Sequence, residues 1–189
     1  LGQNVDSYKW NVDAKGIVKN EAEPVIRFAQ LMGLVSEVNP DLRVRFSTSH
    51  PKDMTDEVLE VMAKKDNLCK YIHLPVQSGS SRILKEMNRG HNREEYFALI
   101  DRIRRIIPGC GLSQDMIAGF PGETEEEFQE LYDWVKEVEF DRVGVFTYSP
   151  EEGTSAFELG DDVPEEVKID RRNRLMELQQ SISLAKNKA

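Results

Sequence analysis

The sequence predicts a parallel α/β fold built from consecutive β/α units. Strand-like runs recur near residues 42, 71, 112 and 142, and a helical pattern lies between each run and the next. Alternation at this spacing indicates parallel strands joined by right-handed crossovers. Four strands and the end of a fifth correspond to half of a (β/α)₈ barrel or to a small open sheet, because a complete barrel typically needs ~250 residues.

The first third of the chain is expected to contain a strand end, a loop, two helices and one strand. Residues 1–5 fit the end of a strand, and the polar residues 8–23 fit a long loop. A helix is expected to open at Pro24, because proline is tolerated in a first turn. Residues 42–46 alternate as a strand does, and the next helix is expected to have Thr55 as its N-cap.

The middle of the chain continues this alternation. A strand is expected at 71–74, a short helix at 81–87, and a long amphipathic helix that Asn92 caps together with Glu95. The following strand, 112–118, leads into the segment D-M-I-A-G-F-P-G-E-T at 115–124. Its glycine-punctuated turn lies at the carboxyl end of a strand, where active sites of α/β folds are found.

The last third begins with a capping box. Thr124 and Glu127 predict the start of a helix that buries an apolar stripe. A strand is expected at 142–146, and a final helix from Pro164 to about Ile182.

Composition narrows the functional classes. A formal net charge of −9 argues against tight binding of a phosphate backbone by this segment alone. The basic clusters Arg102/Arg104/Arg105 and Arg171/Arg172/Arg174 are interpreted as solvated helix faces. No apolar run reaches the length of a membrane span. The start has neither a signal sequence nor an initiator Met, so we expect the chain to be part of a longer protein.

Cysteines and histidines show no metal-ligand spacing. Cys69 and Cys110 fit free thiols in a reducing compartment. His73 is interpreted as a core histidine, whereas His50 fits a loop or a site lining equally well. Asp115 precedes an apolar strand core, so it is either structural or directed to a site.

Small polar residues follow every expected strand. Because the carboxyl ends of parallel strands meet at one edge, these residues predict a ligand face for a ribose, an amino acid head group or a phosphate. The residues are Gln3, Asn4, Ser47, Ser49, Gln77, Ser78, Gly119, Phe120, Tyr148 and Ser149.

Several motifs resemble those of the radical S-adenosylmethionine methylthiotransferases. They are L-G-Q-N-V at 1–5, F-S-T-S-H-P at 46–51, H-L-P-V-Q-S-G-S at 73–80, G-F-P-G-E-T at 119–124 and Y-S-P-x-x-G-T at 148–154. The first and third are similar to the branch that modifies tRNA. The resemblance implies a half to three-quarter TIM-type barrel, a cytoplasmic location, S-adenosylmethionine and two 4Fe-4S clusters as cofactors, and an anticodon loop as substrate.

For the whole enzyme, the resemblance implies radical insertion of a methylthio group at C2 of an isopentenylated adenosine next to the anticodon. It assigns twelve residues to the cofactor face: the ten strand-end residues above, together with Asp115 and Ile117 on the strand before the glycine turn. Two cysteines cannot supply the three-cysteine sets that the family uses for its clusters. Residues 1–189 are therefore expected to be the C-terminal portion of the radical domain, without the cluster loop, the N-terminal cluster domain and the RNA-binding β domain, and inactive alone.

Two alternatives stay open. One is a non-catalytic half barrel that self-associates through an open strand edge. The other is a small α/β enzyme that binds a phosphorylated ligand at the same face.

Overall fold

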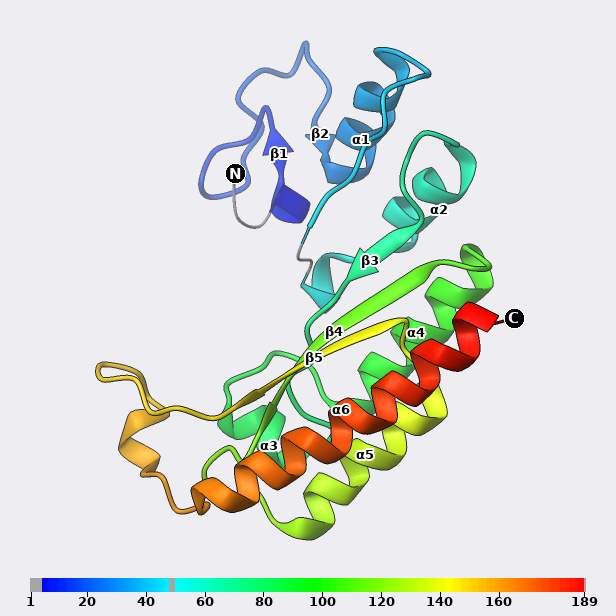
Figure 1. The fold of residues 1–189 in the computed structure, drawn as a ribbon. Helices are drawn as coiled ribbons and strands as arrows, with labels where there is room; N and C mark the ends of the chain where they lie inside the picture. Colours follow the sequence, from blue (N-terminus) through cyan, green and yellow to red (C-terminus); the bar gives the residue numbers. More distant parts are fainter. Residues whose placement is uncertain (1–4, 48–49, 189) are drawn as a thin grey trace. The chain divides into compact units, whose positions relative to one another are not determined.

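The computed structural model describes residues 5–47 and 50–188, which form two compact units (Figure 1). Unit 1 comprises Leu1–His73 and Leu99–Cys110, and unit 2 comprises Leu74–Ala98 and Gly111–Ala189. Helix α4 (Arg93–Ile106) contributes residues to both. Within the described ranges, none of the helices is both long and apolar enough to cross a membrane.

Unit 1 begins with a short antiparallel ribbon. Strand β1 (Lys9–Trp10) lies within the loop expected at 8–23 and pairs with β2 (Ile26–Arg27), so only the residues between the two strands form the loop. The loop is organised by the buried Asn11, whose amide donates to the carbonyl oxygens of Asn20 and Glu23 at 2.7 and 2.8 Å. The remaining elements of this unit are η1 (Val5–Ser7), α1 (Phe28–Glu37), η2 (Pro51–Asp53), α2 (Asp56–Lys64) and β3 (Tyr71–His73).

Three expectations for unit 1 need correction. The first helix begins at Phe28 and not at Pro24, because β2 occupies the residues before it. Residues 42–46 form no strand; Val44 alone makes a parallel bridge, to Leu68. Thr55 is the N-cap of α2, but its hydroxyl makes no capping hydrogen bond.

Unit 2 contains a parallel sheet around β4 (Gly111–Ala118). Strand β5 (Arg142–Thr147) pairs with one edge of β4, from Ser113 opposite Arg142 to Ala118 opposite Thr147. The segment 74–77 pairs with the other edge, where Leu74 N–H donates to Ser113 O and Ile117 N–H donates to Gln77 O. The expected parallel α/β class is therefore confirmed.

Helices cover this sheet in the expected order. They are α3 (Ser81–Glu86), α4, α5 (Glu125–Val138) and α6 (Glu165–Lys188), and a short turn, η3 (Phe157–Leu159), precedes α6. Helix α6 lies along β5 and β4 beside α5 (Figure 1). It extends beyond the expected end at Ile182, because Lys186 pairs with Asp141 at 2.9 Å and holds the last turns.

The core of unit 2 is centred on Trp134, which is fully buried. Its ring lies 5.4 Å from Tyr96, 5.3 Å from Phe97 and 5.4 Å from Phe140. The Tyr96 hydroxyl donates to Leu74 O at 2.6 Å and accepts a hydrogen bond from the buried Gln114 amide. Burial raises the pKa of Tyr96, so its phenol keeps this proton. Helix α4 and the sheet are thereby tied through satisfied polar groups.

Candidate functional site

A cavity of about 560 Å³ opens at the carboxyl end of the sheet in unit 2. We call it the β4–β5 pocket. Six of the twelve residues expected from the sequence line it: Gln77, Asp115, Ile117, Phe120, Tyr148 and Ser149. Three neighbouring chain segments thus bring these residues together, as the parallel order of the strands predicts.

Strand geometry directs two β4 residues into the pocket. Asp115 and Ile117 are two positions apart, so they share one face of the strand. Gly144 lies opposite Asp115 on β5, and a Cβ atom there would come within 2.8 Å of the Asp115 carboxylate. The glycine therefore leaves room for the carboxylate above the neighbouring strand.

An aromatic pair forms the apolar side of the pocket. The rings of Phe120 and Tyr148 meet edge to face with centroids 5.4 Å apart, and Ile83 packs against both. The Tyr148 hydroxyl donates to Ala156 O at 3.1 Å, which fixes the ring. Such a surface can contact a flat heterocycle, while the polar strand ends opposite can contact hydroxyl groups.

Lys168 of α6 contacts both the Tyr148 backbone and the turn at Gly119 next to this pocket. Its side chain is almost completely buried, and its ammonium pairs with Asp161 at 2.6 Å and donates to Tyr148 O at 3.3 Å. Its methylene groups pack against Gly119, where a Cβ would lie 2.4 Å from Lys168 Cγ. Gly119 also has a φ of +74°, so the turn requires glycine for both reasons.

A buried ion pair fixes the same turn. Glu123 accepts the Gly119 N–H at 3.2 Å, and its other carboxylate oxygen lies 3.0 Å from the Arg171 guanidinium. Burial raises the pKa of Glu123 to about 7, although Arg171 favours the ionised form. The interpretation of Arg171 as solvated was wrong: it is 4% exposed, because this face of α6 packs against the turn before α5.

The predicted capping box of α5 is present and carries a further contact. The Thr124 hydroxyl accepts the Glu127 N–H at 3.2 Å, and Glu127 accepts the Thr124 N–H at 3.0 Å. Arg82 also pairs with Glu127 at 2.6 Å and donates to Gly122 O. Burial opposes ionisation of Glu127, but the hydrogen bonds from Arg82, Thr124 and Ser80 lower its pKa to about 2.

Arg89 also lines the β4–β5 pocket, although no sequence pattern predicted it there. It is half-buried, and burial lowers the pKa of its guanidinium. Among the described residues, no acidic side chain forms an ion pair with it. Arg89 follows α3 in a polar turn, so no periodic pattern marks it; only its pocket location distinguishes it from a solvated arginine.

The other expected site residues have different locations. Ser78 is buried, and its hydroxyl accepts the Ser80 N–H at 3.2 Å, so it supports the turn before α3. Gly119 shapes the turn but is absent from the described pocket lining. Ser47 is an exposed residue of unit 1. Gln3, Asn4 and Ser49 lie outside the described residues. Both His50 and the half-buried His73 belong to unit 1, and His50 accepts the Lys52 N–H.

The described residues do not fit an iron–sulfur cluster. Cys69 is half-buried, Cys110 is buried, and neither forms a disulfide. Within residues 5–47 and 50–188, no three His, Cys, Asp or Glu side chains are grouped closely enough to hold a metal ion. No cluster ligand is therefore assigned to the described side chains.

The sheet and its pocket define a parallel α/β protein with a cavity at the strand ends. The family model of the radical SAM superfamily matches residues 5–135, and the chain belongs to this superfamily. Coproporphyrinogen III oxidase from Escherichia coli, a radical SAM enzyme, has a similar fold, with a TM-score of 0.64 and 24% identity over 82% of this chain and 36% of that one.

Curated relatives are similar along the whole chain. The tRNA-2-methylthio-N(6)-dimethylallyladenosine synthase of Christiangramia forsetii is 51% identical over 97% of this chain and 39% of its own length. That of Clostridium botulinum strain Okra is 51% identical over 100% of this chain and 40% of its own length. The chain thus spans about 40% of the length of these relatives.

Proposed function

We propose that this chain is part of a tRNA methylthiotransferase and that the β4–β5 pocket binds S-adenosylmethionine. The main support for this proposal is the Arg89 guanidinium, which lacks an ion-pair partner among the described residues. It lies in a pocket that also has polar strand ends and an aromatic side. The methionine carboxylate would pair with Arg89. Gln77 and Asp115 would accept hydrogen bonds from the ribose hydroxyls, and Ile117 and Phe120 would pack on the adenine.

The proposed substrate is the isopentenylated adenosine named by the relatives, in the unpaired anticodon loop of a tRNA. S-adenosylmethionine, with clusters supplied from outside the described residues, would provide the radical and the methyl group. The contribution of this chain is then to bind and orient the cofactor, with the turn at Gly119 held by Lys168 and Glu123. We further propose that residues 1–189 are the C-terminal portion of the radical domain and lack activity alone.

Calorimetric titration with S-adenosylmethionine tests this function. The chain should bind the ligand, and Arg89→Gln should weaken binding about ten-fold or more, because a charge-assisted hydrogen bond contributes about 1.5–3 kcal/mol. Arg142→Gln is the matched control, since Arg142 is exposed at the opposite end of β5. Its affinity should equal that of the unchanged chain.

Two outcomes would contradict the proposal. The first is the absence of saturable binding by the unchanged chain. The second is saturable binding of ribose 5-phosphate in place of S-adenosylmethionine, which would favour the alternative of an enzyme with a phosphorylated ligand. Self-association of the chain stays a prediction, which light scattering over a concentration series can check.

A further inference from the structure

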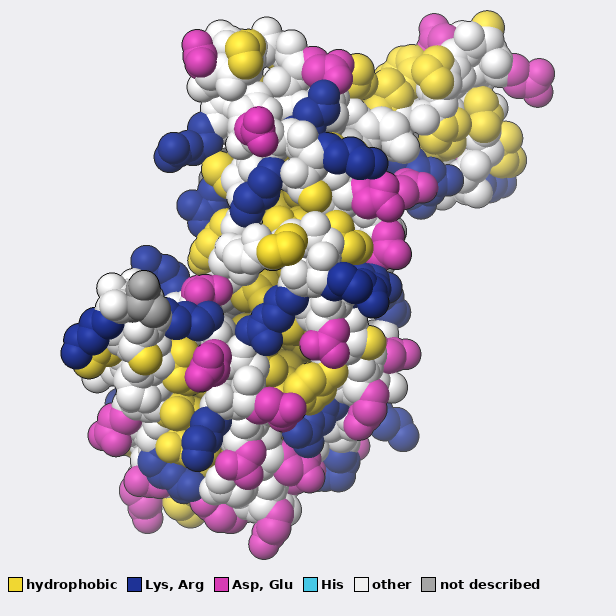
Figure 2. Space-filling view, turned by 90° about the vertical axis from the view of Figure 1, so that its right-hand side faces the viewer, with side chains coloured by type: hydrophobic (Ala, Val, Ile, Leu, Met, Phe, Trp, Pro, Cys, Tyr) yellow, Lys and Arg dark blue, Asp and Glu magenta, His cyan; other side chains and the backbone are white. Residues whose placement is uncertain are grey.

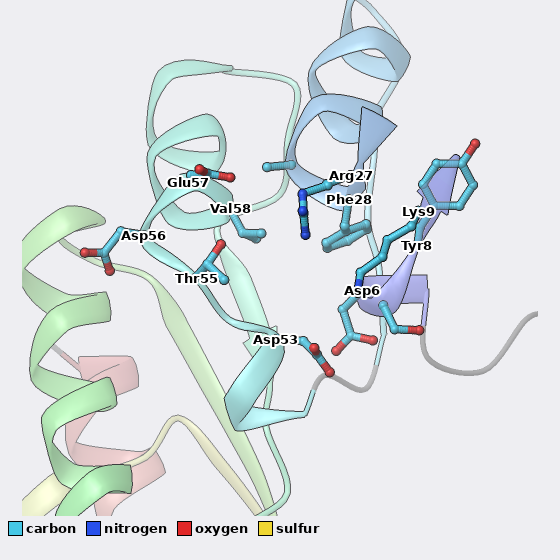
Figure 3. A pocket seen from close by; sticks show the side chains of 12 residues that line it. Asp6, Tyr8, Lys9, Arg27, Phe28, Asp53, Thr55, Asp56, Glu57 and Val58 are labelled. Atoms are coloured by element: carbon cyan, nitrogen blue, oxygen red, sulfur yellow. The ribbon is translucent and has the colours of Figure 1, made fainter. Parts of the chain in front are cut away.

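A second cavity, of about 550 Å³, lies within unit 1 (Figure 3). We call it the ribbon pocket, because β1 and β2 contribute Lys9 and Arg27 to its lining. The first turns of α1 and α2, together with Asp6 and Asp53, complete the enclosure. None of these residues belongs to the β4–β5 pocket, and none is among the twelve site residues expected from the sequence.

Two positive charges face each other at one side of the ribbon pocket. Lys9 and Arg27 are direct partners in the antiparallel register of β1 and β2, and both side chains are exposed. Like charges at opposed positions destabilise a strand pair. Neither forms an ion pair with a described residue, although acidic residues outnumber basic ones by 34 to 25 in the chain. An anion between the two side chains would convert their repulsion into attraction.

The lining of the same cavity also includes four carboxylates, Asp6, Asp53, Asp56 and Glu57, of which Asp56 pairs with Arg102 at 2.9 Å. Asp6 is 7% exposed; its Oδ2 accepts the His50 N–H at 2.8 Å, while its buried Oδ1 has no hydrogen-bond partner among the described residues. A buried carboxylate oxygen without a donor is unfavourable. In Figure 3 the half-buried Asp53 lies beside Asp6, and the guanidinium of Arg27 points toward the cavity from the other side. This acidic side favours a ligand that presents N–H groups.

We propose that the ribbon pocket binds one unpaired nucleotide of an RNA strand, with a base that carries an exocyclic amine. Its phosphate pairs with Lys9 and Arg27. Its amine donates to Asp53, next to the buried carboxyl group of Asp6. Cytosine presents such an amine to a carboxylate, whereas uracil has a carbonyl oxygen at the same position, which a carboxylate repels. The inference rests on the proposed RNA substrate for its biological setting, but its pocket and ligand differ from those of S-adenosylmethionine.

Titration with mononucleotides, followed by NMR chemical shifts, tests the site. The unchanged chain should bind 5′-CMP in preference to both 5′-UMP and cytidine. The double variant Lys9→Gln/Arg27→Gln should weaken binding of 5′-CMP about ten-fold or more, since charge-assisted contacts are lost. Asp53→Asn should reduce the difference between 5′-CMP and 5′-UMP. The matched control is Lys15→Gln/Lys19→Gln, which removes the same charge from exposed positions of the intervening loop and should leave binding unchanged.

The inference is overturned if 5′-CMP fails to saturate the unchanged chain, or if 5′-CMP and 5′-UMP bind equally. It is also overturned if the control variant weakens binding as much as Lys9→Gln/Arg27→Gln. The same samples are titrated with S-adenosylmethionine. If the chain binds 5′-CMP but not S-adenosylmethionine, only the proposed function is contradicted. If it binds S-adenosylmethionine but not 5′-CMP, only this inference is contradicted.

Discussion

The stability of unit 2 should depend on the ionisation of Glu123, and Glu123→Gln should remove that dependence. Burial raises the pKa of this carboxyl from 4.5 to about 7 in the folded chain. A folded-state pKa above the unfolded value means that the folded chain retains the proton longer. The resulting stabilisation is complete below pH 4.5 and is lost as the pH rises through about 7.

The magnitude follows from the size of the pKa shift. The pKa of Glu123 rises from 4.5 in the unfolded chain to about 7 in the folded chain. At about 1.4 kcal/mol per pKa unit, the free energy of unfolding should fall by about 3 kcal/mol as the pH rises through this range. Glutamine is isosteric with the protonated side chain and does not titrate. The difference between the unchanged chain and Glu123→Gln should therefore follow the titration of this group alone.

Urea unfolding over a pH series measures this effect. The chain has two tryptophans, so a Trp10→Phe background leaves Trp134, in the core of unit 2, as the fluorescent reporter. Glu125→Gln is the matched control. The arginines beside Glu125 lower the pKa of that carboxyl against the opposing effect of burial, so it is ionised throughout the window. Its substitution should change the stability but not the slope above pH 4.5.

The reasoning would be refuted if Glu123→Gln kept the slope of the unchanged chain. It would also be refuted if the free energy of unfolding of the unchanged chain rose with pH relative to that of Glu123→Gln. That second result would mean that Arg171 holds the carboxyl in its ionised form despite burial.

Three further predictions concern packing and capping. Gly79→Ala should lower the free energy of unfolding by about 2 kcal/mol, because the new Cβ would lie 2.6 Å from the Leu131 backbone. Gly33→Ala in α1 should raise this free energy by about 0.5–1 kcal/mol, because the space around Gly33 is open. Urea unfolding measures both changes. Thr124→Ala should cost about 1 kcal/mol through the lost cap of α5, and an unchanged urea midpoint would contradict this. Lys168→Met should weaken S-adenosylmethionine binding about ten-fold in calorimetry, because the Tyr148 carbonyl loses its charged hydrogen-bond donor. An unchanged affinity would show that Lys168 does not position Tyr148 for binding.

Sequence patterns correctly predicted those features that depend on residues only a few positions apart. The capping pairs Thr124–Glu127 and Asn92–Glu95 are present, with Asn92 Oδ1 accepting the Glu95 N–H at 2.8 Å. Strand order then placed Gln77, Asp115 and four further predicted residues at one pocket. These results depend on short-range hydrogen bonds and on the geometry of parallel strands.

Other features depend on partners far along the chain and could not be predicted. Arg171 resembles any surface arginine of an amphipathic helix until its contact with Glu123, 48 residues away, is known. Residues 42–46 alternate as a strand does, yet only Val44 finds a backbone partner. Arg89 lines the pocket from an irregular turn, where no periodicity marks a functional side chain.

The position of α6 has a consequence for synthesis of the chain. Every described residue that lines the β4–β5 pocket precedes residue 157, whereas Lys168 and Arg171 of α6, which support the turn at Gly119, follow. A nascent chain that has just passed Ala156 therefore contains all of these lining side chains and Glu123, but it still lacks the two contacts from α6 that complete the support of this turn. Competence to bind a ligand should arise late in translation, when the last helix docks, and a bound ligand should in turn slow the release of that helix.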